Sequence, residues 1–325
     1  MEPAPFHGRV AGGRLPVRAF WLRADDGVRI RVALWQPAGA TATGTVLLFP
    51  GRTEYVEKYA PVADRLAGAG LATLAIDWRG QGLADRLLPD PDKGHVRDFG
   101  DYQRDVRAAV AAARALGLAE PFHLLAHSMG GCIGLRALHE GLGVRTAVFS
   151  APMWGIRFPP RVAPFAGTIA RLGRLLGRGE AYAPGTGAAS YVLAEATAED
   201  NDLTSDAEVF ARLVEQLRQV RGLRLGGPTY RWLDAAIGEM RRLMAMPAPD
   251  IPALAAVGSA EAIVSADAIR ARMASWPLGR LRELPGARHE LLMERAPIRD
   301  AFLADALDLM GAPPEAIARA APAAG

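Results

Sequence analysis

The residues best suited to chemistry lie in the pentapeptide Ala126-His127-Ser128-Met129-Gly130, which follows an apolar run and opens a helical one. A serine on a sharp strand-to-helix turn needs small flanking residues, because strand and helix approach each other closely there. Such a turn raises the hydroxyl above the sheet edge and leaves the N–H of Met129 free to hold an oxyanion. An ordinary helix N-cap is the alternative for Ser128. The context of strand, turn and helix favours a nucleophile.

A serine hydroxyl is a weak nucleophile until a base takes its proton, and the base needs a third group to fix its tautomer. Hydrolases with a serine on this kind of turn carry the three residues in the order serine, acid, histidine. Downstream of Ser128, Glu261 follows an apolar run at 252–257, and His289 follows the next run at 280–284. We therefore predict Ser128 as nucleophile, His289 as base and Glu261 as the acid that orients the base.

A second oxyanion donor is expected in the loop after the apolar run at 45–49. There Pro50-Gly51-Arg52 places a glycine where the backbone must turn closely. A simple turn is the alternative, but the position after the first parallel strand favours an oxyanion hole. We predict that the backbone N–H groups of Arg52 and Met129 form it.

The other five histidines give no reason to expect a metal or another cofactor. We expect His127 to be a packed neighbour of the serine. His7 is near the N-terminus, His95 is in a loop where it could support the site, His123 begins a strand and His139 is on a helix. None has metal-ligand spacing with a second histidine or an acidic residue. The predicted reaction uses no metal and no cofactor.

The composition predicts a large core and no nucleic-acid partner. Of 325 residues, 50% are hydrophobic, and the net charge of +3 comes from scattered arginines rather than from a basic stripe. A single cysteine, Cys132, fits a reducing compartment. No apolar run reaches the roughly 18 residues of a membrane span, and the first residues lack a secretory signal. We expect a cytoplasmic protein, and the sequence does not indicate its oligomeric state.

Short apolar runs alternate with helical segments along most of the chain. An antiparallel hairpin over 17–23 and 28–35 comes first, because Asp25-Asp26-Gly27 is a strong turn signal. Further strands are expected at 45–49, 71–76, 122–126, 146–149, 252–257 and 280–284, and helices at 54–69, 98–116, 132–138, 208–220, 266–275 and 298–310. This order is typical of a largely parallel α/β sheet with helices on both faces.

The alternation stops after Ser150 for almost a hundred residues. Residues 152–246 contain Pro/Gly-rich breaks and helical stretches without clear strands, which predicts a helical insertion between two halves of one sheet. The expected core therefore comprises 1–151, with an N-terminal tail over about 1–16, and 247–311. Residues 312–325 are rich in Ala and Pro and are expected to form a frayed, flexible tail.

With these elements in place, the chain resembles α/β-hydrolases of the bacterial lysophospholipase and monoacylglycerol lipase type over most of residues 45–310. The resemblance depends on several motifs, which are far more specific than the serine turn alone. They are Asp77-Trp78-Arg79-Gly80-Gln81-Gly82, Arg86-Leu87-Leu88, Asp90-Pro91, Gly94-His95-Val96, Asp101-Tyr102, the run from Leu125 to Gly131, Leu203-Thr204, and Gly226-Gly227-Pro228-Thr229-Tyr230-Arg231-Trp232.

The resemblance implies an α/β-hydrolase fold with a mostly parallel eight-stranded sheet and a helical cap over Ser128, formed by residues 152–246. It also implies the triad already described. Three residues depart from the usual pattern: Ala126 replaces glycine, Ala84 replaces serine, and Glu261 replaces the commoner aspartate. Asp267 is the fallback acid, although its spacing is more typical of the helix that follows.

The resemblance further implies hydrolysis of a carboxylic ester in a single-chain lipid through an acyl-enzyme, most simply by a lysophospholipase. A monoacylglycerol lipase or a general carboxylesterase is the alternative on the same machinery, and acyl transfer to a lipid alcohol is a third. A non-catalytic binding module is the remote alternative, because silent members usually lack a triad residue.

One segment of the expected cap bears on contact with lipid. In residues 161–178, Val162, Phe165, Ile169, Leu172 and Leu176 recur at helical spacing, with arginines between them. A basic amphipathic helix can lie in an anionic membrane interface, here the inner membrane. Packing of this apolar face on the core is the interpretation that we favour from the sequence, because most amphipathic helices face a core.

Overall fold

The computed structural model describes residues 1–39, 41–194, 197 and 199–320. At its centre is one nine-stranded sheet in the order β1-β2-β3-β5-β4-β6-β7-β8-β9. Strands β1, β2, β3 and β5 pair antiparallel, and all pairs from β5 through β4 to β9 are parallel. The strands are β1 (Glu2–Pro3), β2 (Arg18–Arg23), β3 (Arg29–Trp35), β4 (Gly44–Phe49), β5 (Leu71–Asp77), β6 (Phe122–His127), β7 (Thr146–Ser150), β8 (Ala253–Gly258) and β9 (Gly279–Leu284).

The central strands are buried along their whole length and mostly apolar because helices cover both of their faces. In β4, Leu47 and Phe49 belong to one hydrophobic cluster, and Val46 and Leu48 belong to the other. This alternation is the two-residue period of a strand, and burial on both faces turns it into a continuous apolar run. Each face thus has a core of its own.

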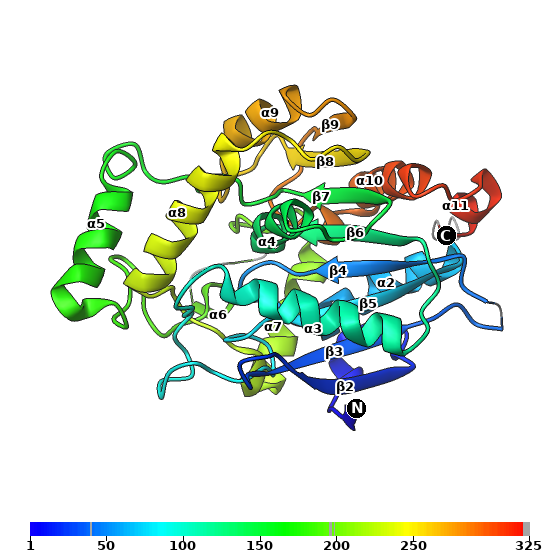
Figure 1. Cartoon of the computed structure of the whole chain (residues 1–325), viewed down its shortest axis with the longest axis horizontal. Helices are drawn as coiled ribbons and strands as arrows, with labels where there is room; N and C mark the ends of the chain where they lie inside the picture. Colours follow the sequence, from blue (N-terminus) through cyan, green and yellow to red (C-terminus); the bar gives the residue numbers. More distant parts are fainter. Residues whose placement is uncertain (40, 195–196, 198, 321–325) are drawn as a thin grey trace.

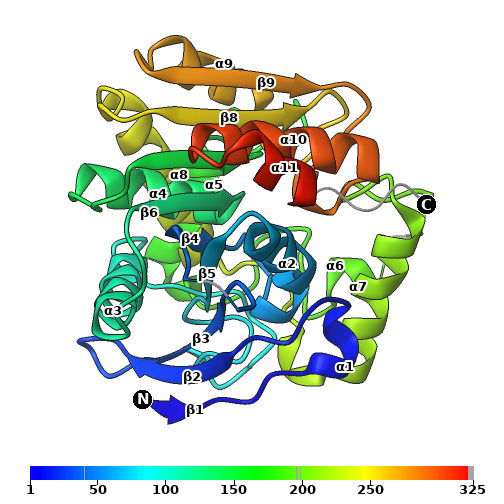
Figure 2. The same ribbon diagram turned by 90° about the vertical axis from the view of Figure 1, so that its right-hand side faces the viewer.

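The two layers of helices are visible in Figure 2. Helices α3, α4 and α9 contribute buried side chains to one cluster, whereas α2, α10 and α11 contribute to the other. Outside the stretch between β7 and β8, the helices are α1 (Gly8–Ala11), η1 (Val56–Tyr59), α2 (Ala60–Gly68), α3 (Asp101–Ala115), α4 (Met129–His139), α9 (Ala266–Ala274), η4 (Leu291–Met293), α10 (Ala296–Leu309) and α11 (Pro314–Ala320). The predicted class, a mostly parallel sheet between helices, is confirmed.

Between β7 and β8 the chain leaves the sheet and forms a helical segment. It contains α5 (Ala166–Gly173), the π-helical turn η2 (Arg174–Arg178), α6 (Tyr191–Ala194), α7 (Ala207–Gln219), η3 (Arg221–Leu223) and α8 (Tyr230–Ala245). Figure 1 shows α5 at one end of the molecule, beyond α8 and away from the sheet.

Three details differ from the sequence-based expectation. A ninth strand exists because Glu2 and Pro3 pair with β2 at the sheet edge. The helix expected over 54–69 is a 3₁₀ turn followed by α2, because Pro61 has no N–H to donate and fits only the first turn of an α-helix. The expected frayed tail instead begins with α11, which packs against the core through Ile317 and the buried Ala320. The rest of that tail, 321–325, lies outside the described residues.

The amphipathic segment 161–178 also differs from the expectation. Its α-helix starts only at Ala166, after Pro164, and the turn that follows breaks at Gly177, whose φ is +76°. The small residues Ala166, Ala170 and Gly173 form its buried side. The prediction that its large apolar side chains face the core is wrong, since Phe165 is 59% and Leu176 is 76% exposed. Small residues let α5 approach α8 closely and turn the large side chains outward.

Candidate active site

Ser128 occupies the sharp turn between β6 and α4, as the pentapeptide predicts. Its φ of +50° and ψ of −119° lie in the positive-φ region of backbone conformation, which residues other than glycine rarely adopt. Such a conformation costs about 1–3 kcal/mol and persists only where the surrounding structure fixes it. Here the amide of Ser128 donates to Ser150 O at 3.0 Å, and Gly130 packs so tightly that a Cβ would lie 2.1 Å from Phe49 O. The strained turn holds the side chain of Ser128 at the end of the central strands.

His289 and Glu261 lie together on the loops that follow β9 and β8. His289 Nδ1 is 2.8 Å from Glu261 Oε2, and both residues are buried. Glu261 Oε1 accepts hydrogen bonds from the amides of Ile263 and Val264 at 2.6 and 3.0 Å. Because the carboxylate of Glu261 is fixed against Nδ1, Nε2 is the ring nitrogen of His289 that is left to act as a base.

The protonation behaviour of this pair follows from burial and charge. Burial opposes the charge of Glu261, but His289 and the two amide donors outweigh it, so the pKa of Glu261 is lowered. Burial likewise disfavours a charged His289, but the facing Glu261 raises the pKa of His289 above its ordinary value of 6.5. The pair therefore stabilises an imidazolium, as a general base requires once it has taken a proton.

Asp267, the fallback acid, lies elsewhere. It sits on α9 with its side chain 93% exposed and forms an ion pair with Arg270 at 2.8 Å. Of the two candidate acids, the structure brings only Glu261 to His289.

The loop with Pro50, Gly51 and Arg52 lies against Ser128. A Cβ on Gly51 would lie 3.0 Å from Ser128 Cβ, so a larger residue there would press on the serine. The following amide, that of Arg52, and the amide of Met129 at the first turn of α4 are the two predicted oxyanion donors. First-turn amides lack intrahelical partners, which leaves the Met129 N–H available.

Residues of the Asp77–Gly82 motif hold this loop in place. Trp78 Nε1 donates to Pro50 O at 2.9 Å, and Gln81 Nε2 donates to Gly51 O at 2.7 Å. The carboxylate of Glu54 accepts a hydrogen bond from the amide of Gly51. The carbonyl groups of Pro50 and Gly51 thus both accept hydrogen bonds, and these bonds fix the orientation of the peptide groups up to the amide of Arg52.

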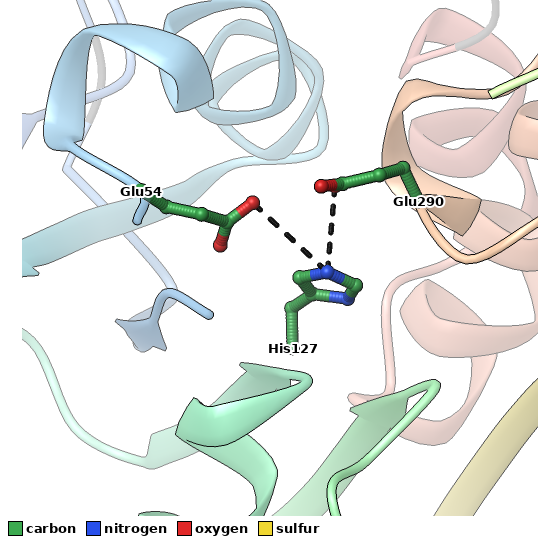
Figure 3. Close-up of side chains that lie close together, drawn as sticks. All are labelled: Glu54, His127 and Glu290. Atoms are coloured by element: carbon green, nitrogen blue, oxygen red, sulfur yellow. Dashed lines mark ion pairs between the residues drawn. The ribbon is translucent and has the colours of Figure 1, made fainter. Parts of the chain in front are cut away.

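A buried network that the sequence analysis missed joins this loop to the histidine loop. The ammonium group of Lys58 contacts Glu54 and also Glu290, the latter at 2.6 Å. Tyr59 OH donates to Glu54 at 2.5 Å. His127, predicted only as a packed neighbour, lies 3.4 Å from Glu290 and 4.0 Å from Glu54 (Figure 3). One signal was available: Lys58 is one of only two lysines in an arginine-rich chain.

The ligand atoms of Glu54, His127 and Glu290 lie within 4.8 Å of one another, so these residues could hold a metal ion by distance. However, the ammonium of Lys58 already contacts both carboxylates as their counter-charge. We interpret the group as a salt-bridge network with Lys58 as its cation.

Ser128 and His289 line a cavity of about 460 Å³ between the sheet edge and the helical segment 152–246. Its walls are mainly apolar, with Phe158, Leu213 and Trp232 from the helical segment and Val264 from the core. Such a cavity suits an apolar chain with its polar end at Ser128. The helical segment also contacts the histidine loop directly, because the amides of His289 and Glu290 donate to Asp202 O and Leu203 O.

Comparison with known proteins places the chain in its class. In the solved structures, a soluble variant of monoglyceride lipase from Saccharomyces cerevisiae, bound to a substrate analogue, has a TM-score of 0.72, with 20% identity over 94% of this chain and 97% of that chain. A carboxyl esterase from Bacillus coagulans in complex with glycerol also has a TM-score of 0.72, with 15% identity over 90% and 97%. The predicted α/β-hydrolase fold is confirmed.

Residues 40–296 match the Hydrolase_4 family, described as serine aminopeptidase, S33, and the chain belongs to this family. Among curated relatives, lysophospholipase L2 of Escherichia coli K12 is 32% identical over 89% of this chain and 88% of that protein. The probable lysophospholipase L2 of Haemophilus influenzae is 31% identical over 82% and 83%. A monoacylglycerol lipase of Mycolicibacterium smegmatis is 36% identical over 33% of this chain.

Proposed function

We propose that this protein is a lysophospholipase that cleaves the carboxylic ester of a single-chain lipid through an acyl-enzyme. The observation that carries the proposal is the mainly apolar cavity that ends at Ser128 and His289, with Glu261 behind the histidine. Two relatives named lysophospholipase L2, each matched over more than four-fifths of both chains, favour this substrate class over a monoacylglycerol.

In the proposed mechanism, Ser128 Oγ attacks the acyl carbonyl while His289 Nε2 takes its proton. Glu261 stabilises the resulting imidazolium, and the amides of Arg52 and Met129 hold the tetrahedral oxyanion. The imidazolium of His289 then protonates the ester oxygen of the leaving group. The bond from this oxygen to the acyl carbon breaks, and the glycerol head group departs as an alcohol. A water molecule, activated by the neutral His289, releases the fatty acid and restores Ser128.

In this proposal residues 152–246 act as a cap on a hydrolase core formed by 1–151 and 247–311. The cap supplies apolar walls for the acyl chain and, through Asp202 and Leu203, backbone support for the histidine loop. A lipid must therefore enter beside or through the cap to reach Ser128.

We further propose that the outer surface of the cap contacts a membrane, which makes the protein a cytoplasmic enzyme that works at the inner membrane. In the described residues, no helix is long and apolar enough to cross a bilayer. Four large apolar side chains, at the N-cap of α5 and along α5 and η2, are each more than half exposed: Phe165, Leu172, Leu175 and Leu176. Arg171 and Arg178 are exposed beside them, whereas Arg174 is held by Asp234 at 2.6 Å. Apolar side chains flanked by free arginines suit an anionic lipid surface.

A hydrolysis panel tests the substrate assignment. Lysophosphatidyl lipids, monoacylglycerols with the same acyl chain and short p-nitrophenyl esters are compared with the purified protein by kcat/KM. We expect the lysophosphatidyl lipids to be preferred. A preference for monoacylglycerols would replace the lysophospholipase by a monoacylglycerol lipase, and turnover of the short esters alone would indicate a general carboxylesterase.

A further inference from the structure

The side chain of Arg52 occupies the wall of the catalytic cavity, next to the predicted oxyanion hole. Its guanidinium carbon lies 5.2 Å from the centre of the Trp232 ring, and Nη2 donates to Gly226 O at 2.6 Å. Gly94 makes room for it, because a Cβ at that position would lie 2.1 Å from Nη2. The position of the guanidinium is thus set by two other segments of the chain, one at Gly94 and one at 226–232.

Arg52 is partly buried, and it differs from the buried cations Arg31 and Lys58 in having no carboxylate partner among the described residues. Arg31 pairs with Glu57 and Asp77, and Lys58 pairs with two glutamates. For Arg52, the described residues provide no carboxylate within ion-pair distance, and its Nε is buried without a hydrogen-bond partner. Burial lowers the pKa of Arg52 to about 10, which still leaves the group charged at neutral pH.

A charge that is partly removed from water is unfavourable unless it is paired, so a guanidinium in the wall of a ligand cavity, with no carboxylate partner among the described residues, indicates an anionic ligand. Arg86 shows what a purely structural arginine looks like in the same region. It also lacks a carboxylate partner, but it donates to three carbonyl groups, those of Gly80, Gly222 and Arg224, and it does not line the cavity. Arg52 makes one such bond and leaves the rest of its donors for another partner.

We propose that the guanidinium group of Arg52 binds the phosphodiester of the substrate head group and thereby selects lysophospholipids over monoacylglycerols. This inference rests on the proposed function. Planar guanidinium groups match the oxygen atoms of a phosphate with a fork of N–H donors, and among the described residues Arg52 uses only its Nη2 for a side-chain hydrogen bond, to Gly226 O.

The covalent spacing of enzyme and substrate supports this assignment. In a lysophospholipid with its acyl chain on the first glycerol carbon, the path from the ester carbonyl carbon to the phosphorus contains as many bonds as the path in arginine from the backbone nitrogen to the guanidinium carbon. When the amide of Arg52 holds the carbonyl oxygen, its own guanidinium can therefore reach the phosphate of the same molecule. A monoacylglycerol has a hydroxyl at that position and offers no charge.

The test measures inhibition constants of three octyl compounds that the enzyme does not cleave, with a soluble p-nitrophenyl ester as substrate. They are the octyl ether of glycerophosphoethanolamine, the octyl ether of glycerol, and octanoate, each below its micellar concentration. Wild type, Arg52→Gln, Arg52→Lys and the control Arg86→Gln are compared. Labelling of Ser128 by a fluorophosphonate reports that each variant is folded at the active site.

We expect the wild type to bind the phosphodiester ether more tightly than the glycerol ether. Arg52→Gln should reduce this preference about tenfold or more, as the loss of a charge-assisted hydrogen bond does. Arg52→Lys should reduce it less, because the charge remains while the fork is lost. Arg86→Gln should leave the preference unchanged.

Two results would overturn the proposal. An equal loss in Arg86→Gln would mean that Arg52 acts only by holding the cap, and a loss for octanoate as large as for the phosphodiester ether would assign Arg52 to the fatty acid carboxylate. Failure of the proposed function would look different. In that case the wild type would not hydrolyse lysophosphatidyl lipids in the substrate panel, whatever the variants do.

Discussion

Two regions of the molecule bury different kinds of side chain: the floor of the cavity at Ser128, formed by Glu54, Lys58 and Glu290, and the outer helix α5 of segment 152–246. On the floor, Glu54, Lys58 and Glu290 are almost fully buried, and each charge has an opposite charge beside it. On the outer helix α5, large apolar side chains face outward and only the small residues are buried. Paired buried charges fix the geometry of the floor, whereas the exposed apolar side chains of α5 suit the membrane contact proposed above. If this division is right, changes in one region should leave the other region's task intact.

The largest loss of activity is expected from a change at Ser128, the proposed nucleophile. Ser128→Ala should lower esterase turnover by about 10⁴-fold or more, because triad members act as a unit, while the fold remains. Steady-state assays with a p-nitrophenyl ester measure the loss, and circular dichroism checks the fold. A fluorophosphonate probe should label the wild type at Ser128, as located by peptide mass spectrometry. Labelling at Ser150 or Ser259 would refute the assignment.

The second-largest loss of activity is expected from a change at Glu261, the proposed acid. Glu261→Gln keeps the side-chain size but removes the charge that stabilises the imidazolium, so kcat should fall steeply, by about 10³- to 10⁴-fold. Asp267→Asn is the matched control, because that carboxyl is exposed and paired only with Arg270. The control should retain wild-type kcat. The reverse outcome would make Asp267 the acid.

Lys58→Met tests whether the floor depends on its paired charges. The substitution leaves Glu54 and Glu290 buried without their cation, which should reduce the free energy of unfolding by about 3–5 kcal/mol. Chemical denaturation measures this loss, and Lys93→Met is the control at the other, more exposed lysine. A stability equal to wild type would mean that the network is not a structural tie between the two loops.

The pH dependence of activity should reflect the raised pKa of His289. In the proposed mechanism His289 must be neutral to accept the proton of Ser128, and Glu261 raises the pKa of His289 above 6.5. Activity is therefore expected to be low at acid pH and to rise as pH increases through that raised value. A profile of kcat/KM against pH measures its midpoint in the free enzyme. A midpoint below 6.5 would contradict the proposed coupling between His289 and Glu261.

The smallest effect on chemistry is expected from the cap surface. Replacing Leu172 and Leu176 by Glu should abolish flotation with anionic vesicles, because it removes apolar contact and adds repulsion. Hydrolysis of a soluble short ester should stay within about twofold of wild type, since exposed substitutions rarely disturb a fold. Thr168→Glu, on the same helix, controls for added charge alone. Vesicle binding that survives the double substitution would exclude α5 as the contact surface.

The order of the elements and the position of the serine turn could be predicted because local sequence encodes them. Buried parallel strands are continuous apolar runs, and the eight predicted strands lie within about two residues of the observed ones. The turn around Ser128 depends on small residues that are adjacent in the chain. The roles of Ser128, Glu261 and His289, and of the Arg52 and Met129 amides, stay predictions for the experiments above.

Other features were decided only by the tertiary structure. Glu290 is 232 residues from Lys58, whereas Glu54 is a near neighbour of Lys58, and no local pattern indicates that one ammonium will bridge two loops. The same holds for Arg52: that no carboxylate pairs with it among the described residues is a property of all its neighbours at once. Helix α5 is the clearest case: its apolar spacing determined an amphipathic helix, but not which side would be buried. Close packing against α8 decided that, because only the small side of the helix fits there and the large apolar side chains are left outside.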